Sequence, residues 1–326
     1  MKLISLEEHW CPRELYEAPA SPRYQSIQAV KRMRSPQEFQ KITAAISDLD
    51  PDRIALMDQN NVDMQIVSLC AANMELLDQP LAQHYARLAN DLLLTRIQKY
   101  PERFRGWAAL PTVNPITAAE ELKRCMETGY FVGAMINGHI NGHYLDEPQF
   151  EPLLTMAEKL DAPIYIHPAV PPQKVLDAYY QVADPYAKNV LISGGWGWHI
   201  ETGTHLLRMV VTGVFDRHPQ LKIIVGHLGE GIPFFMERLK NATGANLNHC
   251  YPYYLQNNVY YTISGFHDPD LFDFVYKKVG VNHLMFSADY PFNPLKQEIT
   301  YFNSLSLPEN ERRIVAGLNA TKLFKL

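Results

Sequence analysis

Four carboxylate or imidazole side chains come directly after short apolar segments, and side chains of these two types can bind a divalent metal ion. They are Glu7, His9, His167 and Asp289. Burying such groups without a partner is costly, so they must be hydrogen-bonded or bind a metal. Each one alone is explained equally well by hydrogen bonds to the backbone, but four at matching positions favour a metal. Two imidazoles and two carboxylates suit Zn or Mn, with an open position for water or substrate.

The spacing of Glu7 and His9 makes them a Glu-x-His pair. Side chains alternate between the two faces of a strand, so residues two apart point to the same side. We therefore expect Glu7 and His9 to face one metal ion together and Glu8 to point elsewhere.

A second candidate pair follows another apolar segment, where His227 is succeeded by Gly229, Glu230 and Gly231. The glycines let the backbone turn closely into the next helix. Glu230 can fix the tautomer of the His227 ring, and a histidine held in this way can act as acid, base or transition-state stabiliser. A further structural ligand or a core histidine is the alternative for His227.

Three residues are candidates for substrate binding. Arg238 lies eight residues after Glu230, about two helical turns, and could hold an anionic group or be a solvated helix arginine. Trp198, with Trp196, could form an apolar wall over a planar ligand, although core packing explains both tryptophans as well. Asn137 is the third candidate.

Other histidines carry weaker signals. His139 and His143 have an H-x₃-H spacing, but their glycine-rich surroundings indicate a solvent-facing loop rather than one helix face. His218 comes just before a predicted strand, so we expect it to have a structural role.

These residues need elements that bring them together, and short apolar, β-rich segments recur with helical patterns between them. The predicted strands are 3–6, 64–69, 104–110, 132–136, 164–166, 222–225, 260–263 and 284–286. The predicted helices include 80–99, 116–128, 150–160, 205–215, 233–241 and 269–278. Eight β/α repeats predict a (β/α)₈ TIM barrel, whose active site lies at the carboxyl ends of the strands.

The domain organisation follows from the same pattern. We expect one barrel domain over residues 1–326, with insertions over about residues 10–62 and 168–220 at the face that carries the active site. A doubly wound sheet is the alternative fold, but the first strand is not followed by the glycine-rich phosphate loop typical of nucleotide binding.

Composition excludes several classes of function. The chain has 326 residues, a formal charge of −5 and four scattered cysteines. It contains no basic block of the kind that nucleic acids or anionic membranes attract, and no apolar stretch of the ~20 residues that a membrane-spanning helix needs. Glu7 and Glu8 interrupt the region where a signal peptide would be apolar, so we expect a cytoplasmic protein.

The motifs above resemble those of the amidohydrolase-related family typified by aminocarboxymuconate semialdehyde decarboxylase and γ-resorcylate (2,6-dihydroxybenzoate) decarboxylase. The most specific match is residues 215–231, FDRHPQLKIIVGHLGEG, and residues 6–9, 53–58, 144–146, 165–168 and 286–292 support it. Many relatives carry His-x-His in the first strand, whereas Glu7-x-His9 is similar to the γ-resorcylate type of hydroxybenzoate decarboxylase. Ala169 departs from the arginine expected in many relatives, which leaves the substrate open.

The resemblance implies a nonoxidative carboxy-lyase with one divalent metal ion, Zn or Mn, and no organic cofactor. Its substrate would be a small aromatic carboxylic acid, and the chain would form a homodimer or homotetramer. By position, Glu7, His9, His167 and Asp289 would hold the metal. His227 and Glu230 would form the second catalytic pair, with Asp289 protonating the ring carbon and Arg238 contacting substrate.

Two other functions remain open at this point. The ligand set also suits a hydrolase of a small lactone, amide or ester, in which metal-bound water attacks a carbonyl. A barrel that binds a small acid without catalysis is a third possibility, which an intact metal set disfavours.

Overall fold

Eight parallel strands form one sheet in the order in which they occur along the chain. In this computed structural model the described residues are 1–12, 15, 35–70, 74–242 and 246–326. The strands are β1 (Ile4–Trp10), β2 (Met64–Leu69), β3 (Phe104–Ala109), β4 (Phe131–Asn137), β5 (Ile164–His167), β6 (Ile223–Val225), β7 (Val259–Thr262) and β8 (Leu284–Met285). The predicted (β/α)₈ barrel is confirmed, with all eight predicted strands in place.

The barrel closes beside the candidate metal ligands. The segment that follows β8 forms a parallel bridge between Tyr290 and Glu8 on β1, and the His9 amide donates to the Tyr290 carbonyl oxygen at 2.8 Å. Chain closure therefore fixes the carboxyl end of β1 against the segment that carries Asp289.

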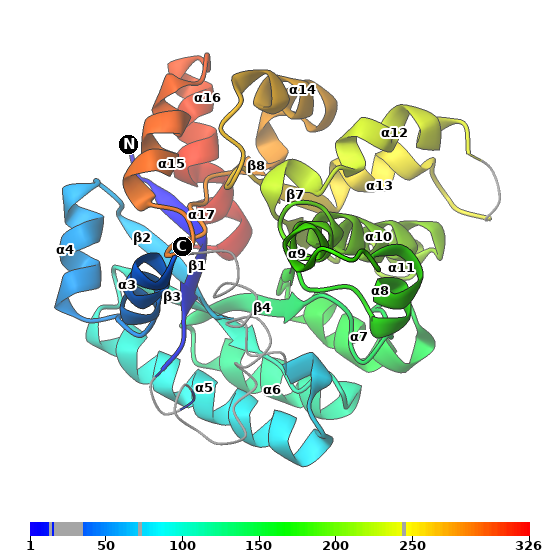
Figure 1. Ribbon diagram of the computed structural model, residues 1–326, viewed down its shortest axis with the longest axis horizontal. Helices are drawn as coiled ribbons and strands as arrows, with labels where there is room; N and C mark the ends of the chain where they lie inside the picture. The colour runs from blue at the N-terminus through cyan, green and yellow to red at the C-terminus, as the bar shows by residue number, and fades with distance from the viewer. Residues whose placement is uncertain (13–14, 16–34, 71–73, 243–245) are drawn as a thin grey trace.

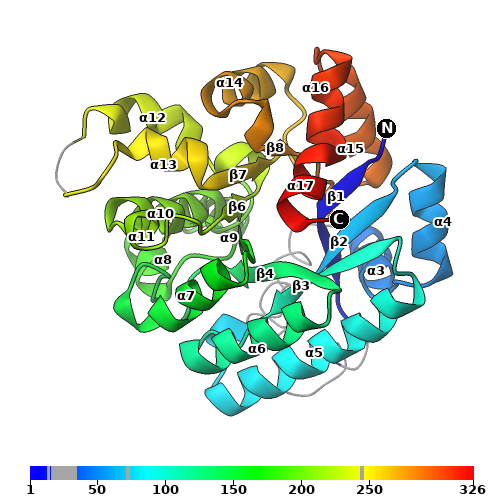
Figure 2. The same cartoon turned by 180° about the vertical axis from the view of Figure 1, so that it is seen from behind.

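Helices surround the strands in both views of the molecule (Figures 1 and 2). They are α3 (Pro36–Ile46), α4 (Pro51–Gln59), α5 (Gln79–Lys99), α6 (Pro115–Glu127), α7 (Glu151–Lys159), α8 (Gln173–Tyr179), α9 (Pro185–Ile192), α10 (Gly197–Val211), α11 (Val214–Arg217), α12 (Ile232–Lys240), α13 (Tyr251–Asn257), α14 (Pro269–Val279), α15 (Leu295–Ser304), α16 (Glu309–Arg313) and α17 (Asn319–Phe324). Among the described residues, none of these helices is long and apolar enough to cross a membrane.

The two long connections contain helices of their own. Helices α3 and α4 lie in the first, of which residues 13–14 and 16–34 are outside the described part of the chain, and α8 to α11 lie in the second. The helix predicted over 205–215 is wrong at both ends, since α10 begins at Gly197 and stops at Val211 before the separate α11. The earlier start brings Trp198 and His199 into its first turn.

Apolar side chains form separate layers inside and outside the sheet. Inside the barrel, Ile4, Leu6, Trp107 and Tyr165 belong to one buried cluster, and Phe324 of α17 packs against Trp107. A larger cluster fills the space between the strands and the helices around them. The strands read as nearly continuous apolar segments because both of their faces are buried.

One extra residue in β1 determines which of its polar side chains enter the barrel. Ser5 pairs with Gln65 on β2, but Glu8, three residues later, pairs with Val67, only two residues later. Such a β-bulge changes the side-chain alternation. Leu6 and Glu7 both face the barrel interior as a result, whereas Ser5 and Glu8 both face outward.

The outward face of β1 holds a buried polar network that braces the ligand-bearing strand. Glu8 accepts from Gln65 Nε2 at 3.0 Å and from the Ala288 amide at 3.1 Å. Arg53 on α4 donates to Gln65 Oε1 at 2.7 Å and to the His9 carbonyl oxygen at 3.4 Å. Burial raises the pKa of Glu8 to about 7, although Arg53 opposes that shift. The Arg53 charge therefore compensates the Glu8 charge in a dry environment.

We predict that Arg53→Met lowers the free energy of unfolding at pH 8 by about 3–5 kcal/mol, because it leaves the ionised Glu8 buried without a compensating charge. The double variant Glu8→Gln/Arg53→Met recovers a large part of that loss. Urea denaturation of the three proteins measures both effects. Arg96→Met is the matched control, since Arg96 forms a half-exposed pair with Asp50 and its loss costs less than about 1 kcal/mol. Equal losses for the single and double variants would show that Arg53 does not compensate the Glu8 charge.

Candidate functional site

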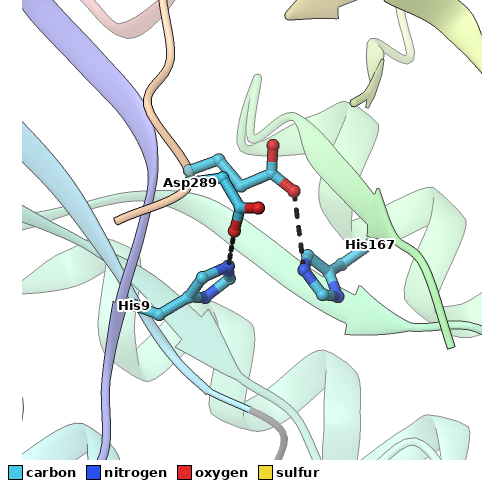
Figure 3. A group of neighbouring side chains, drawn as sticks. His9, His167 and Asp289 are labelled. Atoms are coloured by element: carbon cyan, nitrogen blue, oxygen red, sulfur yellow. Dashed lines mark ion pairs between the residues drawn. The ribbon is translucent and has the colours of Figure 1, made fainter. Parts of the chain in front are cut away.

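The four predicted metal ligands meet at the carboxyl ends of the strands. His9 Nε2 lies 3.1 Å from Asp289 Oδ1, and His167 Nε2 lies 3.5 Å from Glu7 Oε1 (Figure 3). One ligand atom from each of the four residues lies within 4.8 Å of all the others. The structure thus brings β1, β5 and the segment after β8 together as a possible metal site.

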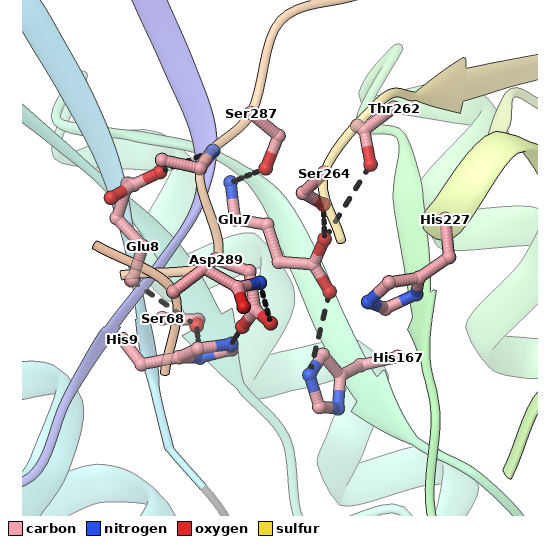
Figure 4. Close-up of polar contacts among 12 residues, drawn as sticks. Glu7, Glu8, His9, Ser68, His167, His227, Thr262, Ser264, Ser287 and Asp289 are labelled. Carbon is pink, nitrogen blue, oxygen red and sulfur yellow. Dashed lines mark hydrogen bonds and ion pairs between the residues drawn. The ribbon is translucent and has the colours of Figure 1, made fainter. Parts of the chain in front are cut away.

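Three of these side chains are held through the atom that faces away from the cluster (Figure 4). The Ser68 hydroxyl lies 2.8 Å from His9 Nδ1. The Ser264 hydroxyl donates to Glu7 Oε2 at 3.0 Å, and the Asn293 amide donates to Asp289 Oδ2 at 3.1 Å.

The hydrogen bonds of Ser68 determine which His9 nitrogen carries the proton. Ser68 also donates to the Glu8 carbonyl oxygen, so its lone pair is left to accept from His9 Nδ1. The His9 Nε2 atom is then unprotonated and available to a metal, as outer hydrogen bonds of this kind require.

The buried atoms without hydrogen-bond partners and the charges of these residues suit a divalent cation. Glu7 Oε1 and His9 Nε2, which face the cluster, are buried without a hydrogen-bond partner among the described residues. Burial and the neighbouring His9 together lower the pKa of His167 to about 3, so the ring is neutral, as a metal ligand must be. Burial, together with the Asp289 charge, raises the pKa of Glu7. A bound cation would relieve both effects.

His227 and Glu230 form the predicted second pair, directly after β6. His227 Nδ1 lies 2.8 Å from Glu230 Oε1, whose side chain is fully buried. His227, Leu228 and Glu230 have positive φ angles of 48°, 57° and 55°, respectively. Gly226 precedes them, and a Cβ there would lie 3.3 Å from carboxylate oxygens of both Glu230 and Glu7, so these neighbours would have to shift by a few tenths of an ångström.

Charge couples this pair to the metal cluster. Burial disfavours a charged His227, but the Glu230 and Glu7 carboxylates outweigh it and raise the pKa of His227 well above its usual range. Burial likewise opposes ionisation of Asp289, but the hydrogen bond from His227 outweighs it and lowers the pKa of Asp289 to about 2. His227 therefore holds a proton next to an ionised Asp289.

Asn137 lies beside the cluster, as its candidate role requires. It pairs in register with His167 on the neighbouring strand. Its backbone amide and its side-chain amide both donate to Glu75 Oε1, at 2.8 and 3.4 Å. Glu75 is fully buried, and burial raises its pKa to about 7 despite those hydrogen bonds. Glu75 thus fixes the Asn137 side chain from behind.

The other two substrate-binding candidates lie in different surroundings. Trp198 sits in the first turn of α10, and its Nε1 is buried without a hydrogen-bond partner among the described residues. Arg238 is exposed on α12, and no polar contact within the described ranges joins it to Glu230 or to the metal cluster. Both roles stay predictions.

The remaining histidines divide into structural and exposed ones. His139 is buried, with its Nδ1 accepting from the Gly142 amide at 3.0 Å, so the solvent-facing loop predicted for it is wrong at this residue and right for the exposed His143. His218 contacts Glu151 and Glu158 just before β6, at the end of the barrel opposite the site. It therefore has the structural surroundings that we expected.

Several supporting residues lie outside the sequence-based prediction. Ser68 and Ser264 are polar residues at strand ends, the same signal that identified the metal ligands. Glu75 and His199 come from a short 3₁₀ turn and from the start of a helix, where no periodic pattern marks them.

Comparisons with known proteins agree with this geometry. The family model described as Amidohydrolase matches residues 36–326. The chain is 35% identical over 306 residues to a gamma-resorcylate decarboxylase of Rhodococcus jostii, covering 88% of this chain and 91% of that protein. A solved 2,6-dihydroxybenzoate decarboxylase, complexed with 2,6-dihydroxybenzoate, superposes with a TM-score of 0.88 at 31% identity over the whole of both chains. A dihydroxybenzoic acid decarboxylase of Polaromonas sp., with bound manganese and the inhibitor 2-nitroresorcinol, has a TM-score of 0.88 at 30% identity, covering 100% of this chain and 97% of that one.

We predict that Glu75→Gln increases stability above pH 7 but not at pH 4.5. Glu75 has a pKa of about 7 in the folded chain against an ordinary value of 4.5, so between these values the folded state holds a proton that the unfolded state has released. Stability of the parent protein therefore falls as pH rises through this window. The variant lacks that dependence and keeps the Oε1 acceptor for Asn137. Its advantage should grow with pH to at most about 3 kcal/mol.

Urea denaturation at pH 4.5, 6, 7 and 8 measures this difference. Glu120→Gln, at an exposed position on α6, is the control and should give a difference that does not change with pH. A constant difference for Glu75→Gln as well would contradict the raised pKa.

Proposed function

Because the chain belongs to the amidohydrolase family, we propose that it is a metal-dependent, nonoxidative decarboxylase of a hydroxybenzoate-type aromatic acid. The observation that carries this proposal is the Glu7, His9, His167 and Asp289 cluster with protonated His227 beside it, in a chain similar over most of its length to decarboxylases of dihydroxybenzoates. The enzyme is then a carboxy-lyase that releases CO₂.

The metal is Mn or Zn, held by the four ligands, and no organic cofactor takes part. The manganese of the Polaromonas protein supports Mn, and the mixed nitrogen and oxygen ligands suit either ion. A bound divalent ion would supply Lewis-acid stabilisation to negative charge on substrate oxygen atoms.

Decarboxylation requires one proton at the ring carbon that carries the carboxylate. The C–C bond breaks, its electron pair stays with the ring, and the new C–H bond uses that pair. In this proposal Asp289 delivers the proton, but its low pKa keeps it ionised before substrate binds. His227 contacts Asp289 and holds a proton, so it can supply the proton that Asp289 passes to the carbon. Glu230 keeps the His227 ring oriented through Nδ1.

Substrate recognition and assembly complete the proposal. Asn137, held by Glu75, contacts a polar group of the substrate, and Trp198 forms an apolar wall beside the ring. Arg238 contacts the substrate carboxylate, which from its exposed place on α12 requires a rearranged helix or a second subunit. The protein is a cytoplasmic homodimer or homotetramer.

Incubating the Mn- or Zn-loaded protein with a panel of hydroxybenzoates and aryl lactones tests the reaction. We expect CO₂ from a benzoate with a hydroxyl group next to the carboxylate. Removing the metal with a chelator should abolish the reaction, and adding Mn should restore it. Ring opening of lactones without CO₂ release would replace the decarboxylase with a hydrolase.

We predict that Asp289→Asn lowers kcat by about 10²–10⁴-fold, because the amide cannot deliver the proton. The assay is CO₂ release at saturating Mn, with bound metal measured on the same sample to separate loss of the proton from loss of the ion. Asp270→Asn, at an exposed position on α14, is the control. Turnover retained by Asp289→Asn would exclude this role.

A further inference from the structure

His199 contacts the outer side of the Glu230 carboxylate. It lies in the first helical turn of α10, in the second long connection of the barrel. Its Nδ1 is hydrogen-bonded to Glu230 Oε2, and its Nε2 lies 2.9 Å from the Gly194 carbonyl oxygen. The His199 ring also packs edge-on against the His227 ring, with 5.2 Å between centroids, and against Phe266. His199 is therefore fixed on several sides.

Glu230 consequently sits between two imidazole rings. One carboxylate oxygen faces His227 Nδ1 and the other faces His199 Nδ1, and its side chain is fully buried. A carboxylate bound through one oxygen only could rotate or shift in its cavity. The second hydrogen bond removes that freedom, so the position of Glu230 depends on a residue from a different part of the chain.

We propose that His199 is a positioning residue, which fixes the Glu230 carboxylate and through it the orientation of the His227 ring. This inference rests on the proposed function only in taking His227 as the proton-handling residue. The contacts themselves are independent of the substrate.

Hydrogen-bond roles explain why a histidine suits this position. The Gly194 carbonyl oxygen can only accept, so His199 Nε2 donates to it. Burial opposes a charged Glu230, but His227 and His199 outweigh it and lower the pKa of Glu230 to about 2, so the carboxylate is ionised and also only accepts. The His199 ring therefore faces an acceptor at each of its two nitrogens. Asparagine could replace the Nδ1 donor, whereas leucine would fill the space and donate nothing.

The same three residues could instead hold a second metal ion, because their ligand atoms lie within 4.8 Å of one another. Two features favour the hydrogen-bonded arrangement. Each Glu230 oxygen is hydrogen-bonded to a different imidazole ring, and His199 Nε2 is hydrogen-bonded to the Gly194 carbonyl oxygen. Metal content decides between the two arrangements.

The first experiment compares His199→Leu with His199→Asn in the Mn-loaded enzyme. We expect His199→Leu to lower kcat about 10–100-fold, as for other residues that orient an active-site ring, with KM changed by less than about 3-fold. His199→Asn should recover most of the loss. Adding His199→Leu to Glu230→Gln should lower kcat no further, because His199 acts through Glu230. Equal losses in the two His199 variants, or additive losses with Glu230→Gln, would overturn the proposal.

The second experiment needs no substrate, so its outcome is separable from failure of the proposed reaction. In Zn-loaded protein with ¹⁵N-labelled histidine, the Nδ1–H signal of His227 is assigned by its absence from His227→Asn. We expect His199→Leu to shift or broaden this signal and His199→Asn to preserve it. His218→Leu is the matched control, since His218 is also held by two carboxylates but lies at the opposite end of the barrel, and it should leave the signal unchanged.

An unchanged His227 signal in His199→Leu would overturn the proposal. So would two metal ions per parent chain falling to one in His199→Leu, because that result would make His199 a ligand. One ion per chain in both proteins supports the positioning role.

Discussion

Two carboxylates, the fully buried Glu7 and the largely buried Asp289, lie beside each other at one end of the barrel, and their charge is the constraint on which the surrounding structure depends. In a dry environment such a pair is stable only when positive charge and hydrogen-bond donors face it. The structure supplies donors from Ser264 and Asn293 and a protonated His227. Among the described residues, Glu7 Oε1 and His9 Nε2 remain without a hydrogen-bond partner. A divalent cation would complete this arrangement.

The sequence predicts the barrel and the metal ligands because both depend on strand ends. Apolar segments identify the strands, and the polar residues that terminate them must converge when parallel strands lie side by side. Glu7 points to the same side as His9, as predicted, but strand alternation alone does not explain why that side is the barrel interior. Strict alternation from Ile4 and Leu6 would turn Glu7 outward, and the bulge between Ser5 and Glu8 reverses it. A bulge leaves no periodic signature in a strand whose two faces are both buried.

Residues that support the site from helices and turns are harder to predict. Glu75 and His199 reach the site because tertiary packing places a 3₁₀ turn and the start of α10 beside it. Their sequence neighbours resemble those of any polar residue in a connection. For Arg238 the sequence left two roles open, binding of an anionic substrate group or a solvated helix arginine, and the residue is exposed on α12. Spacing within an element can be read from sequence, but the approach of separate elements cannot.

Several residues of this site have a backbone conformation that is unfavourable for residues other than glycine. His227, Leu228, Glu230 and Asp289 all have φ between 48° and 57°, a region that costs non-glycine residues about 1–2 kcal/mol each. Such conformations persist only where surrounding contacts determine them. Here the contacts are the Glu230 hydrogen bonds to two histidines, the Asn293 bond to Asp289 and the closure of β1 against Tyr290. The segment that carries Asp289 is therefore held in part by the contact that closes the barrel, so a change in either alters the other.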